Sequence, residues 1–477
     1  MTTEPVDTFD LVILGAGTGG YAAAFRAADL GMSVALVDRY RIGGTCLHWG
    51  CIPTKAMLES ADLIDRIRHA ADFGIGVGEP VPDLPAIARR RDGIVERMTK
   101  GLHSLVKKHK VTYIRGTGVL EGATRIRVAT IGDDDQPAGE RVLTSRDTIL
   151  ATGSRTKSLP GLVPDGERIV TSDHILRSDR VPASLIVVGA GAVGMEFASF
   201  YADMGTKVTV LEYAPAVVPL EDAEVSKEME RAFTRRGITV MTNARFDAAG
   251  VVADADGVRV TVGREGEAPA ELRAEQMLVA TGRAANTDAV GLETTKAVVE
   301  RTLVQVDPAT MQTAEPHLYA IGDIIGGLWL AHVAAHEGLN AVHAIAGEEV
   351  HAIDYTKMPR ATYSRPQVAS IGRTQAECEA AGIPVRIGKV PFQVIGKAVI
   401  HGETGGFTKI IAHAETDEIL GVHMIGAGVT DLIAEASAAM LFEATAWEVG
   451  AAVHPHPTMS EIMGEAAMAV AGRSINF

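Results

Sequence analysis

The chain has 477 residues, an apolar fraction of 47% and a formal net charge of −15. The negative balance disfavours a nucleic-acid surface, which needs a basic patch, so we expect no nucleic-acid partner. No segment reaches the roughly 18 consecutive apolar residues of a membrane span, so we expect no membrane partner either. The length exceeds that of a single core, and we expect about three domains.

The first eight residues, MTTEPVDT, are polar and have neither a basic start nor an apolar signal core. We interpret them as the frayed tail of a cytoplasmic protein. The chain contains only three cysteines, which do not make a structural disulfide framework. In a reducing compartment, a close pair of cysteines is more often catalytic or metal-binding.

Residues 11–38 follow the pattern of a dinucleotide-binding unit: an apolar strand, a GxGxxG turn, an apolar helix and a second strand that ends in an acid. Gly15 would make the tight turn, Gly17 would let a pyrophosphate approach the backbone, and Gly20 would let the helix pack against the strand. The helix N-terminus would offer free N–H groups to the phosphates. Asp38 would accept hydrogen bonds from a ribose hydroxyl pair.

The same pattern recurs at residues 185–212, which share 10 of 28 positions with the first copy at an offset of 174 residues. Gly189, Gly191 and Gly194 take the three glycine roles, and Glu212 is the acid. Two complete copies predict two bound dinucleotides. The charge of Glu212 would repel a 2′-phosphate, and the following segment, YAPAVVPL, contains no Arg or Lys to receive one. We therefore expect NAD rather than NADP at the second copy.

Later segments predict further strands and turns of the two nucleotide-binding domains and a separate C-terminal region. TILATGS (148–154) and MLVATGR (277–283) are strand-turn pairs that each close a domain, and short alternating strands precede both. YAIGD (319–323) is a strand that ends at Asp323, which would bond a ribityl chain or a phosphate-bridging water. After about residue 352, strand-like runs such as VASIG predict an antiparallel sheet. A helix predicted in this last region carries on one side the apolar residues Leu432, Ile433, Ala436 and Ala439–Leu441.

Two of the three cysteines, Cys46 and Cys51, lie five positions apart in the segment GGTCLHWGCIPTK (43–55). They follow the first nucleotide unit directly and precede a helical pattern. Structural zinc would need four ligands, and no second Cys pair or Cys/His set accompanies them, so we expect no metal. Inert thiols are the plainer alternative, but the setting favours a redox-active disulfide. Lys55 could lower a thiol pKa by its charge, or it could be an ordinary solvated lysine of the helix.

The segment HPHPTMSE (454–461) offers a base for thiol chemistry. Prolines flank His456 and fix its backbone, and Glu461, just inside the next helix, could orient the imidazole and stabilise its protonated form. A histidine in a proline-rich turn is often structural, which is what we expect for His454. The presence of a redox cysteine pair in the same chain favours a catalytic role for His456.

These residues resemble the disulfide-reductase flavoproteins, the class I pyridine nucleotide-disulfide oxidoreductases. The resemblance covers essentially residues 8–477 and is carried by GGTCLHWGCIPTK, GAGAVG with its acid, AIGDIIGGLWLAHVAAHEG (320–338) and HPHPTMSE. It implies an α/β fold with two Rossmann-like dinucleotide-binding domains and a C-terminal α+β dimerisation domain. The implied domains are residues 1–154 (FAD-binding, first part), 155–282 (NAD-binding), 283–352 (central, completing the FAD site) and 353–477 (dimer interface).

The resemblance also implies catalytic roles. Cys46 would be the interchange thiol that meets the substrate, and Cys51 would be the charge-transfer thiol against the flavin. The chain would form a homodimer, in which His456 and Glu461 of one subunit act on the thiols of the other.

The resemblance implies FAD at the first unit and NAD at the second, with Lys55 paired to Glu196 near both cofactors. The FAD residues that it implies are Gly15, Gly17, Gly20, Asp38, Gly44, Thr45, Lys55, Thr152, Gly153, Asp323 and Ala331. The NAD residues that it implies are Gly189, Gly191, Gly194, Glu196, Glu212 and Gly282.

Within the family, the residues resemble the branch that oxidises a protein-bound dihydrolipoyl dithiol with NAD⁺. The partners would be lipoyl domains and the acyltransferase core of a 2-oxoacid dehydrogenase complex, or a glycine cleavage system, and the sequence leaves open which. Glutathione-type reductases favour NADPH, which Glu212 opposes. Mercuric and high-molecular-weight thioredoxin reductases need a C-terminal thiol pair, which GRSINF (472–477) lacks. Soluble transhydrogenases, or a scaffold without activity, would lack part of the Cys-Cys and His-Glu sets, which are complete here.

Two further features stay open. His48 and Trp49 replace the commoner Asn-Val between the cysteines, and Trp49 could either alter access to the disulfide or simply pack. Cys378 is far from the pair in sequence, and we expect it to be a buried structural thiol.

Overall fold

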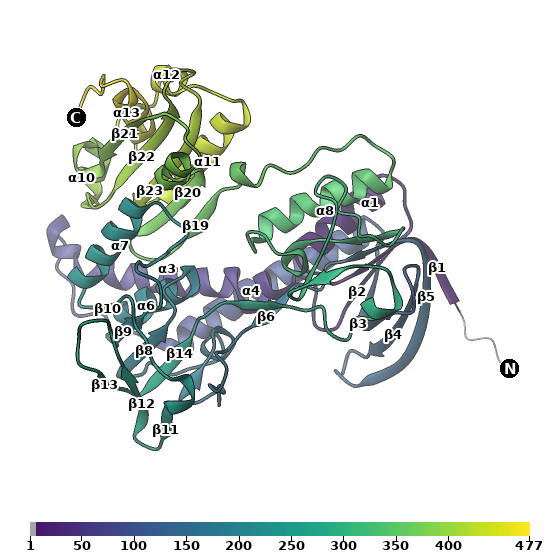
Figure 1. The fold of residues 1–477 in the computed structure, drawn as a ribbon. Coiled ribbons are helices and arrows are strands. Elements are labelled where there is room, and N and C mark those ends of the chain that lie inside the picture. The colour runs from purple at the N-terminus through teal and green to yellow at the C-terminus, as the bar shows by residue number, and fades with distance from the viewer. Residues whose placement is uncertain (1–5) are drawn as a thin grey trace. The chain divides into compact units, whose positions relative to one another are not determined.

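The computed structural model describes residues 6–477, so the start of the expected N-terminal tail lies outside the described residues. The chain forms two compact units, each assembled from separate stretches of sequence (Figure 1). Unit 1 contains the residues up to 56, 88–157 and 283–353, and unit 2 contains residues 57–87, 158–282 and 354–477. The domain boundaries expected from the sequence, with the ligand assigned to each, stay a prediction.

The core of unit 1 is a sheet whose central strands run parallel. Its parallel strands, in spatial order, are β3 (Thr112–Leu120), β2 (Val34–Asp38), β1 (Val6–Leu14), β5 (Pro137–Leu150) and β18 (Leu318–Ala320). The strand β4 (Arg125–Ile131) pairs antiparallel with β3 and with β5. Residues 11–13 of β1 are fully buried, as is typical of parallel strands covered on both faces.

Helices α1 (Thr18–Asp29) and α8 (Ala331–Ile345) of unit 1 pack backbone to backbone. A Cβ atom on Gly19 would lie 2.8 Å from the Ala334 carbonyl oxygen, and one on Gly338 would lie 2.7 Å from the Gly19 carbonyl oxygen. Only residues without a side chain allow this approach. Because α1 follows β1 and α8 follows β18, both helices begin at the carboxyl end of the sheet, where α/β proteins bind their ligands.

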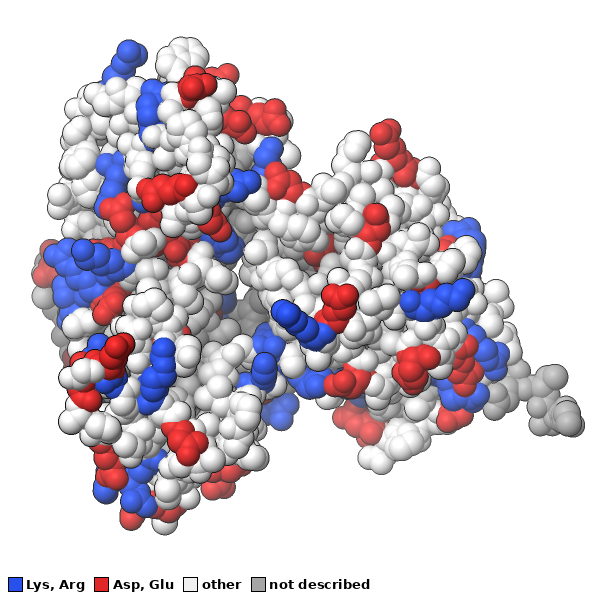
Figure 2. All heavy atoms as spheres, in the orientation of Figure 1, with Lys and Arg blue, Asp and Glu red and all other residues white. Residues whose placement is uncertain are grey.

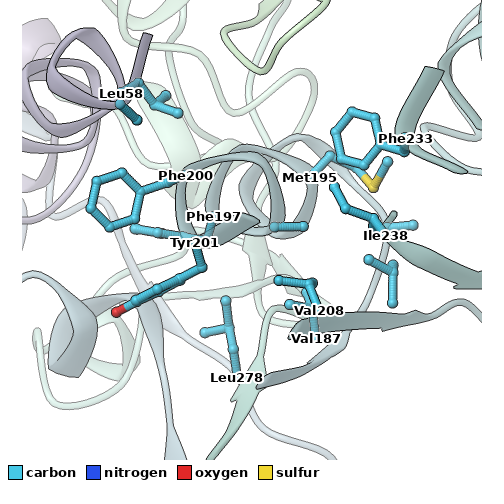
Figure 3. Packing of buried hydrophobic residues seen from close by; sticks show 14 of the residues in the cluster. Leu58, Val187, Met195, Phe197, Phe200, Tyr201, Val208, Phe233, Ile238 and Leu278 are labelled. Carbon is cyan, nitrogen blue, oxygen red and sulfur yellow. The ribbon is translucent and has the colours of Figure 1, made fainter. Parts of the chain in front are cut away.

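Unit 2 contains a second parallel sheet, in the order β10-β9-β8-β14-β7. Its strands are β10 (Thr239–Met241), β9 (Lys207–Leu211), β8 (Ser184–Val188), β14 (Gln276–Val279) and β7 (Ile169–Val170). Helix α6 (Ala192–Asp203) is almost entirely buried, with Phe197 and Tyr201 at most 2% exposed. Figure 3 shows these rings beside Val187, Val208 and Leu278, the first two on β8 and β9 and the third on β14. The order β8, α6, β9 repeats the order β1, α1, β2 of unit 1.

The C-terminal part of unit 2 is a five-stranded antiparallel sheet, as the sequence predicts. In spatial order its strands are β19 (Arg360–Thr362), β20 (Gln367–Gly372), β23 (Ile419–Gly426), β22 (Phe407–His413) and β21 (Val385–Pro391). Helix α11 (Val429–Leu441) buries Ile433, Ala436 and Met440, whereas Leu441 is 68% exposed. The expected apolar side is therefore wrong at Leu441, because this residue points about 100° round the helix from Met440.

The remaining elements lie between these strands and helices in the chain. They are α2 (Gly44–Trp49), α3 (Cys51–Arg68), η1 (Ala70–Phe73), α4 (Leu84–Lys108), β6 (Ser154–Thr156), α5 (Ser172–Ile175), α7 (Ala223–Arg235), η2 (Ala248–Gly250), β11 (Val252–Asp254), β12 (Gly257–Val262), β13 (Ala270–Ala274), β15 (Arg283–Ala285), η3 (Leu292–Thr294), β16 (Val299–Glu300), β17 (Leu303–Val304), η4 (Gly322–Ile325), η5 (Tyr355–Lys357), α9 (Gln375–Ala380), η6 (Phe392–Val394), α10 (Gly396–His401), α12 (Ala446–Ala451) and α13 (Glu461–Val470). Within residues 6–477, no helix is long and apolar enough to cross a bilayer. Figure 2 shows basic and acidic side chains interspersed on the visible face.

A buried ion cluster in unit 2 joins α7 to the C-terminal sheet. Lys409 on β22 is 1% exposed, and its Nζ lies 3.0 Å from Asp222 Oδ1 and 2.8 Å from Gln375 Oε1. Asp222 also caps α7 by accepting the N–H of Glu224. Burial opposes the charge of Asp222, but the hydrogen bond from Lys409 and the nearby charges hold the pKa of Asp222 below its ordinary value. The cluster thus fixes the start of α7 against β22.

We predict that Lys409→Met lowers the free energy of unfolding by about 3 kcal/mol, because it leaves the buried Asp222 carboxylate without its cation. The matched change Lys227→Met, on the exposed face of α7, should cost no more than about 0.5 kcal/mol. Since folding lowers the pKa of Asp222, this stabilisation is present above the ordinary pKa of 3.8 and is lost as the pH falls below it. Urea unfolding at several pH values measures both effects, and equal losses in the two variants would contradict the account.

Candidate active site

The loop between β1 and α1 turns where the first glycine pattern predicts. Gly15 has φ of +108°, and a Cβ atom on it would lie 2.1 Å from the Ala151 carbonyl oxygen. A Cβ atom on Gly20 would lie 1.9 Å from the Gly15 carbonyl oxygen. The turn and the start of the helix are therefore closed to any side chain at these two positions.

The space above Gly17 is open by contrast. A Cβ atom on Gly17 would have no atom within 4 Å, and no side chain caps the N-terminus of α1. The first N–H groups of a helix need partners, and the positive end of the helix dipole favours an anion. The loop therefore fits a phosphate group resting on the backbone.

The loop between β8 and α6 repeats this geometry. Gly189 has φ of +103°, and Cβ atoms on Gly189 and Gly194 would lie 2.5 Å from the Ala280 oxygen and 1.9 Å from the Gly189 oxygen. Gly191 again has open space around its Cβ position, and α6 again has no side-chain cap. Unit 2 therefore contains a second phosphate-accepting loop of the same design.

The acid that ends each second strand braces the glycine loop. Asp38 Oδ2 accepts the N–H of Ala16 at 2.7 Å, and Glu212 Oε2 accepts the N–H of Ala190 at 2.6 Å. Burial raises the pKa of Asp38, against the lowering effect of its backbone hydrogen bonds. A carboxylate has about four lone-pair sites, so both acids can still accept a ribose hydroxyl. The sequence pattern suggested only the ribose contact, and it contains no separate signal for the bracing role.

The cysteine pair lies directly beside the first loop. A glycine, Gly50, with φ of −148° and ψ of −113°, separates α2, which carries Cys46, from α3, which begins at Cys51. The N–H of Gly43 donates to the Ala16 carbonyl at 2.8 Å. The broken helix places the two free thiols close enough for Cys51 to act directly on Cys46. The spacing of five residues therefore produces a close pair, as expected from the sequence.

The surroundings of Cys46 disfavour its thiolate. The pKa of Cys46 is raised first by the hydrogen bond with Cys51 and then by burial, and the charge of Lys55 and a hydrogen bond from Thr18 oppose this effect. Lys55 therefore acts on the Cys46 pKa in the direction expected from the sequence. A thiolate in this pair forms more readily when a base accepts the proton.

Asp323 lies in a polar cluster of unit 1 that the sequence pattern only partly indicates. Its carboxylate accepts the hydroxyl of Ser154, and the Arg283 Nε lies 2.6 Å from that hydroxyl and 3.9 Å from Asp323 Oδ2. Ser154 begins β6 and Arg283 begins β15, which pair antiparallel. Ser154 and Arg283 directly follow the two Ala-Thr-Gly turns of the sequence. Their position after these turns is the sequence signal that could have indicated them. At Ala331, α8 begins without a side-chain cap.

The histidine and glutamate of the C-terminal segment form a hydrogen-bonded pair in unit 2. His456 Nδ1 lies 2.8 Å from Glu461 Oε1, and the second carboxylate oxygen accepts the N–H of Thr458. Burial opposes the charge of Glu461, but these hydrogen bonds hold its pKa below the ordinary value, so the carboxylate stays ionised. The His456 side chain is 78% exposed. His454 instead pairs with Glu435 at 2.7 Å and is 12% exposed, as a structural histidine would be.

Other predicted residues are placed within their own units. Glu196 on α6 is 4% exposed and accepts the N–H of Tyr363 at 2.9 Å. It belongs to unit 2 and Lys55 to unit 1, so their expected pairing stays a prediction. Cys378 on α9 is fully buried, as expected. Trp49 packs edge-on against Tyr40, with ring centroids 5.2 Å apart.

The remaining positions implied for the cofactors lie in the turns described above. Gly44, Gly153 and Gly282 have positive φ angles of +57°, +68° and +114°. Thr152 is held by Asn286: its Oγ1 donates to the Asn286 carbonyl at 2.8 Å, and its own carbonyl accepts from the Asn286 side chain at 2.9 Å. Thr45 is part of α2. Their roles in binding a cofactor stay predictions.

Comparison with known proteins agrees with this geometry. The pyridine nucleotide-disulphide oxidoreductase family matches residues 9–338, and the dimerisation domain of that family matches residues 358–467. The chain therefore belongs to the pyridine nucleotide-disulphide oxidoreductases. The presence of the dimerisation domain supports a homodimer.

The similarity extends over whole chains. The protein is 45% identical to the dihydrolipoyl dehydrogenase of Bacillus subtilis over 100% of both chains, and 41% identical to that of Zymomonas mobilis over 99% of this chain and 100% of the relative. The structure of LpdA from Mycobacterium tuberculosis matches with a TM-score of 0.87 at 29% identity, over 97% of this chain and 99% of the other. RclA from Escherichia coli, a HOCl-induced flavoprotein disulfide reductase, matches with a TM-score of 0.83 at 23% identity, over 96% of this chain and 99% of the other, which shows the fold alone.

FAD and NAD(H) are the cofactors of this family. The two glycine loops fit them, because each combines an uncapped helix N-terminus, open space at the middle glycine and a carboxylate at the end of the second strand. That FAD binds the first loop, beside the cysteines, and NAD(H) the second stays a prediction.

We predict that Gly191→Ala weakens the binding of NAD⁺, whereas Gly194→Ala lowers the stability of the fold. A methyl group on Gly191 would enter open space, so the fold should keep its melting temperature while the Kd for NAD⁺ rises about tenfold, equivalent to roughly 1.4 kcal/mol. A methyl group on Gly194 would overlap the Gly189 oxygen, so the fold itself should be destabilised. Calorimetric titration and thermal unfolding separate the two effects. Unchanged NAD⁺ binding by the Gly191 variant would contradict the assignment.

Proposed function

We propose that the protein is a dihydrolipoyl dehydrogenase, which oxidises protein-bound dihydrolipoyl groups to lipoyl disulfides and reduces NAD⁺ to NADH. The observation that carries the proposal is the close Cys46–Cys51 pair, held against the first glycine loop by a break in the helix. A dithiol pair at this place can exchange electrons with both a substrate dithiol and a bound nucleotide.

The chemistry follows from the side chains, starting from the oxidised Cys46–Cys51 disulfide. His456 takes a proton from one substrate thiol, with Glu461 stabilising the imidazolium that results. The substrate thiolate attacks Cys46, breaks the disulfide and frees Cys51 as a thiolate. The second substrate thiol then displaces Cys46, so the substrate leaves as a disulfide and both cysteines are reduced. FAD, when bound, would accept the two electrons of the dithiol and pass them to NAD⁺.

The preference for NAD⁺ over NADP⁺ is assigned to Glu212. Its carboxylate is fixed by the N–H groups of Ala190 and Ala214, so it cannot turn away from a ribose at the loop. A 2′-phosphate would meet this negative charge at close range. Residues 213–220 carry no Lys or Arg. The Arg245 guanidinium lies over the Tyr213 ring, 3.4 Å from its centroid, and donates to the Tyr213 and Ala244 carbonyls.

The His456–Glu461 pair is proposed to act on the thiols of the other subunit. It lies inside the segment that matches the dimerisation domain, and the imidazole is 78% exposed in the single chain. A general base must come within about 3 Å of the proton that it takes. Because the imidazole is exposed in the single chain, we propose that the other subunit supplies the thiols on which it acts.

The macromolecular partners are proposed from the substrate. A dihydrolipoyl group carried on a protein arm implies lipoyl domains and the acyltransferase core of a 2-oxoacid dehydrogenase complex, or a glycine cleavage system. A cytoplasmic location is part of this proposal.

The first experiment is steady-state NADH formation from dihydrolipoamide with NAD⁺, run beside NADP⁺ and beside NADPH with oxidised glutathione. Rapid NADH formation that is lost in Cys46→Ser is the expected result. Turnover with NADPH and glutathione, in place of dihydrolipoamide and NAD⁺, would move the protein to a neighbouring reductase.

We predict that His456→Gln lowers kcat for NADH formation by at least about 100-fold, because the substrate thiol loses its base. Glu461→Gln removes the charge and keeps the shape, so it should cause a smaller fall. Reduction of ferricyanide by NADH requires no thiol proton transfer and is the control, because it should be retained in both variants. Full dihydrolipoamide turnover in His456→Gln would rule out this base.

A further inference from the structure

The second glycine loop is supported by a strained backbone beside it. The N–H of Val218 donates to the Ala190 carbonyl, in the middle of that loop, at 2.8 Å. Val218 has φ of +39°, which is unusual for a β-branched residue, and it precedes Pro219, which favours an extended backbone before it. Such a conformation persists only where the surrounding structure holds it. The 217–222 segment, which carries Val218, must therefore be held in place by other contacts.

Part of this hold comes from α7, which follows the segment. The Val218 carbonyl accepts the N–H of Glu221 at 2.9 Å and the hydroxyl of Ser226 at 3.3 Å. Asp222 ends the segment and caps α7 by accepting the N–H of Glu224 at 3.1 Å. The segment is therefore a turn that joins the second glycine loop to α7, and all of it lies inside unit 2.

Two cations of the C-terminal sheet contact the same segment. Arg360 on β19 donates to the Leu220 carbonyl at 3.2 Å, and its Nε lies 3.4 Å from Glu221 Oε1. Lys409 on β22 donates to both oxygens of Asp222, at 3.0 and 3.1 Å. The strands β20 and β23 lie between β19 and β22. The sheet therefore holds the segment at two separate places, its middle and its end.

Arg360 links the segment to the sheet. The Glu221 side chain is 9% exposed, and its Oε2 is buried without a hydrogen-bond partner within residues 6–477. A buried carboxylate is costly unless a cation offsets its charge, and Arg360 lies beside this one. The Arg360 Nε also lies 3.3 Å from Ser370 Oγ on the neighbouring strand β20, to which it donates. The guanidinium is thus fixed by the sheet and in turn fixes the segment.

We propose that Arg360 is a positioning residue for the dinucleotide of unit 2. It keeps the 217–222 segment in its strained form, so that the Val218 N–H stays on the second glycine loop, while Lys409 anchors the end of the segment. The proposal rests on the proposed function, in which this loop binds NAD⁺. Without Arg360 the segment would relax, the Ala190 carbonyl would lose its partner, and the loop would fit a phosphate less closely.

The test compares two arginines on the two edge strands of the C-terminal sheet. Arg360→Met removes both contacts to the segment. Arg386→Met, on β21, is the matched control, because Arg386 pairs with Asp417 at 2.6 Å. Deuterium exchange of the FAD-loaded protein is followed without NAD⁺ by mass spectrometry with fragmentation. The Val218 amide should exchange about tenfold faster in Arg360→Met and at the parental rate in Arg386→Met.

Calorimetric titration measures whether the change reaches the nucleotide. The Kd for NAD⁺ should rise about fivefold in Arg360→Met and stay parental in Arg386→Met. Arg360→Lys keeps the charge but lacks the forked donors, so its Kd and its exchange rate should lie between those of the parent and Arg360→Met. A merely structural arginine would lower the melting temperature and leave the Val218 exchange and the Kd unchanged.

Equal exchange rates and equal Kd values in the parent and Arg360→Met would overturn the proposal, as would equal changes in Arg360→Met and Arg386→Met. If Arg360→Met does not fold, parental exchange and parental Kd in Arg360→Lys overturn it.

Deuterium exchange uses no nucleotide, so it fails independently of the proposed function. A parent protein that does not bind NAD⁺, but whose Val218 amide exchanges faster in Arg360→Met, would lose its proposed cofactor and keep this support of the loop. A parent protein that binds NAD⁺, with no change of exchange in Arg360→Met, would keep its cofactor and lose the support.

Discussion

The close approach of Gly17 to Gly44 is the constraint on which the rest of the site depends. At this point a backbone that must remain open to a phosphate also supports the helix that carries Cys46. Any side chain at Gly44 would push α2 away from the loop, and the thiols would move away from the nucleotide with it. The same contact therefore fixes the helix that carries Cys46 against the first glycine loop.

The two glycine loops share a backbone hydrogen bond but lead into different segments. In both loops the carbonyl before the middle glycine accepts an N–H from the segment that follows the second strand: Ala16 accepts from Gly43, and Ala190 accepts from Val218, each at 2.8 Å. In unit 1 that segment continues into the cysteine helix. In unit 2 it continues through a capped turn into α7, without a thiol. Both units thus carry the same type of glycine loop, and the cysteine pair follows the loop of unit 1.

Much of this arrangement could be predicted from the sequence, because glycine spacing, strand patterning and the acid at a fixed distance are local signals. The antiparallel C-terminal sheet, the close cysteines and the His456–Glu461 hydrogen bond follow from such signals. The bracing by Asp38 and Glu212, the cluster of Asp323 with Ser154 and Arg283, and the Lys409 cluster join residues far apart in the chain, so no local pattern marks them. The prediction was wrong at Leu441 because this residue lies about 100° round the helix from the buried Met440, so it is exposed.

The central claim is that the thiols of one subunit work with the histidine of the other, and heterodimer complementation tests it most directly. Differently tagged Cys46→Ser and His456→Gln chains are co-expressed, and the mixed dimer is purified on both tags. If the subunits share their sites, one site of the mixed dimer combines intact thiols with an intact histidine, and dihydrolipoamide turnover should recover to about half of the parental rate per dimer. If each chain supplied its own histidine, both sites would be damaged, and a mixed dimer as inactive as its parents would contradict the account.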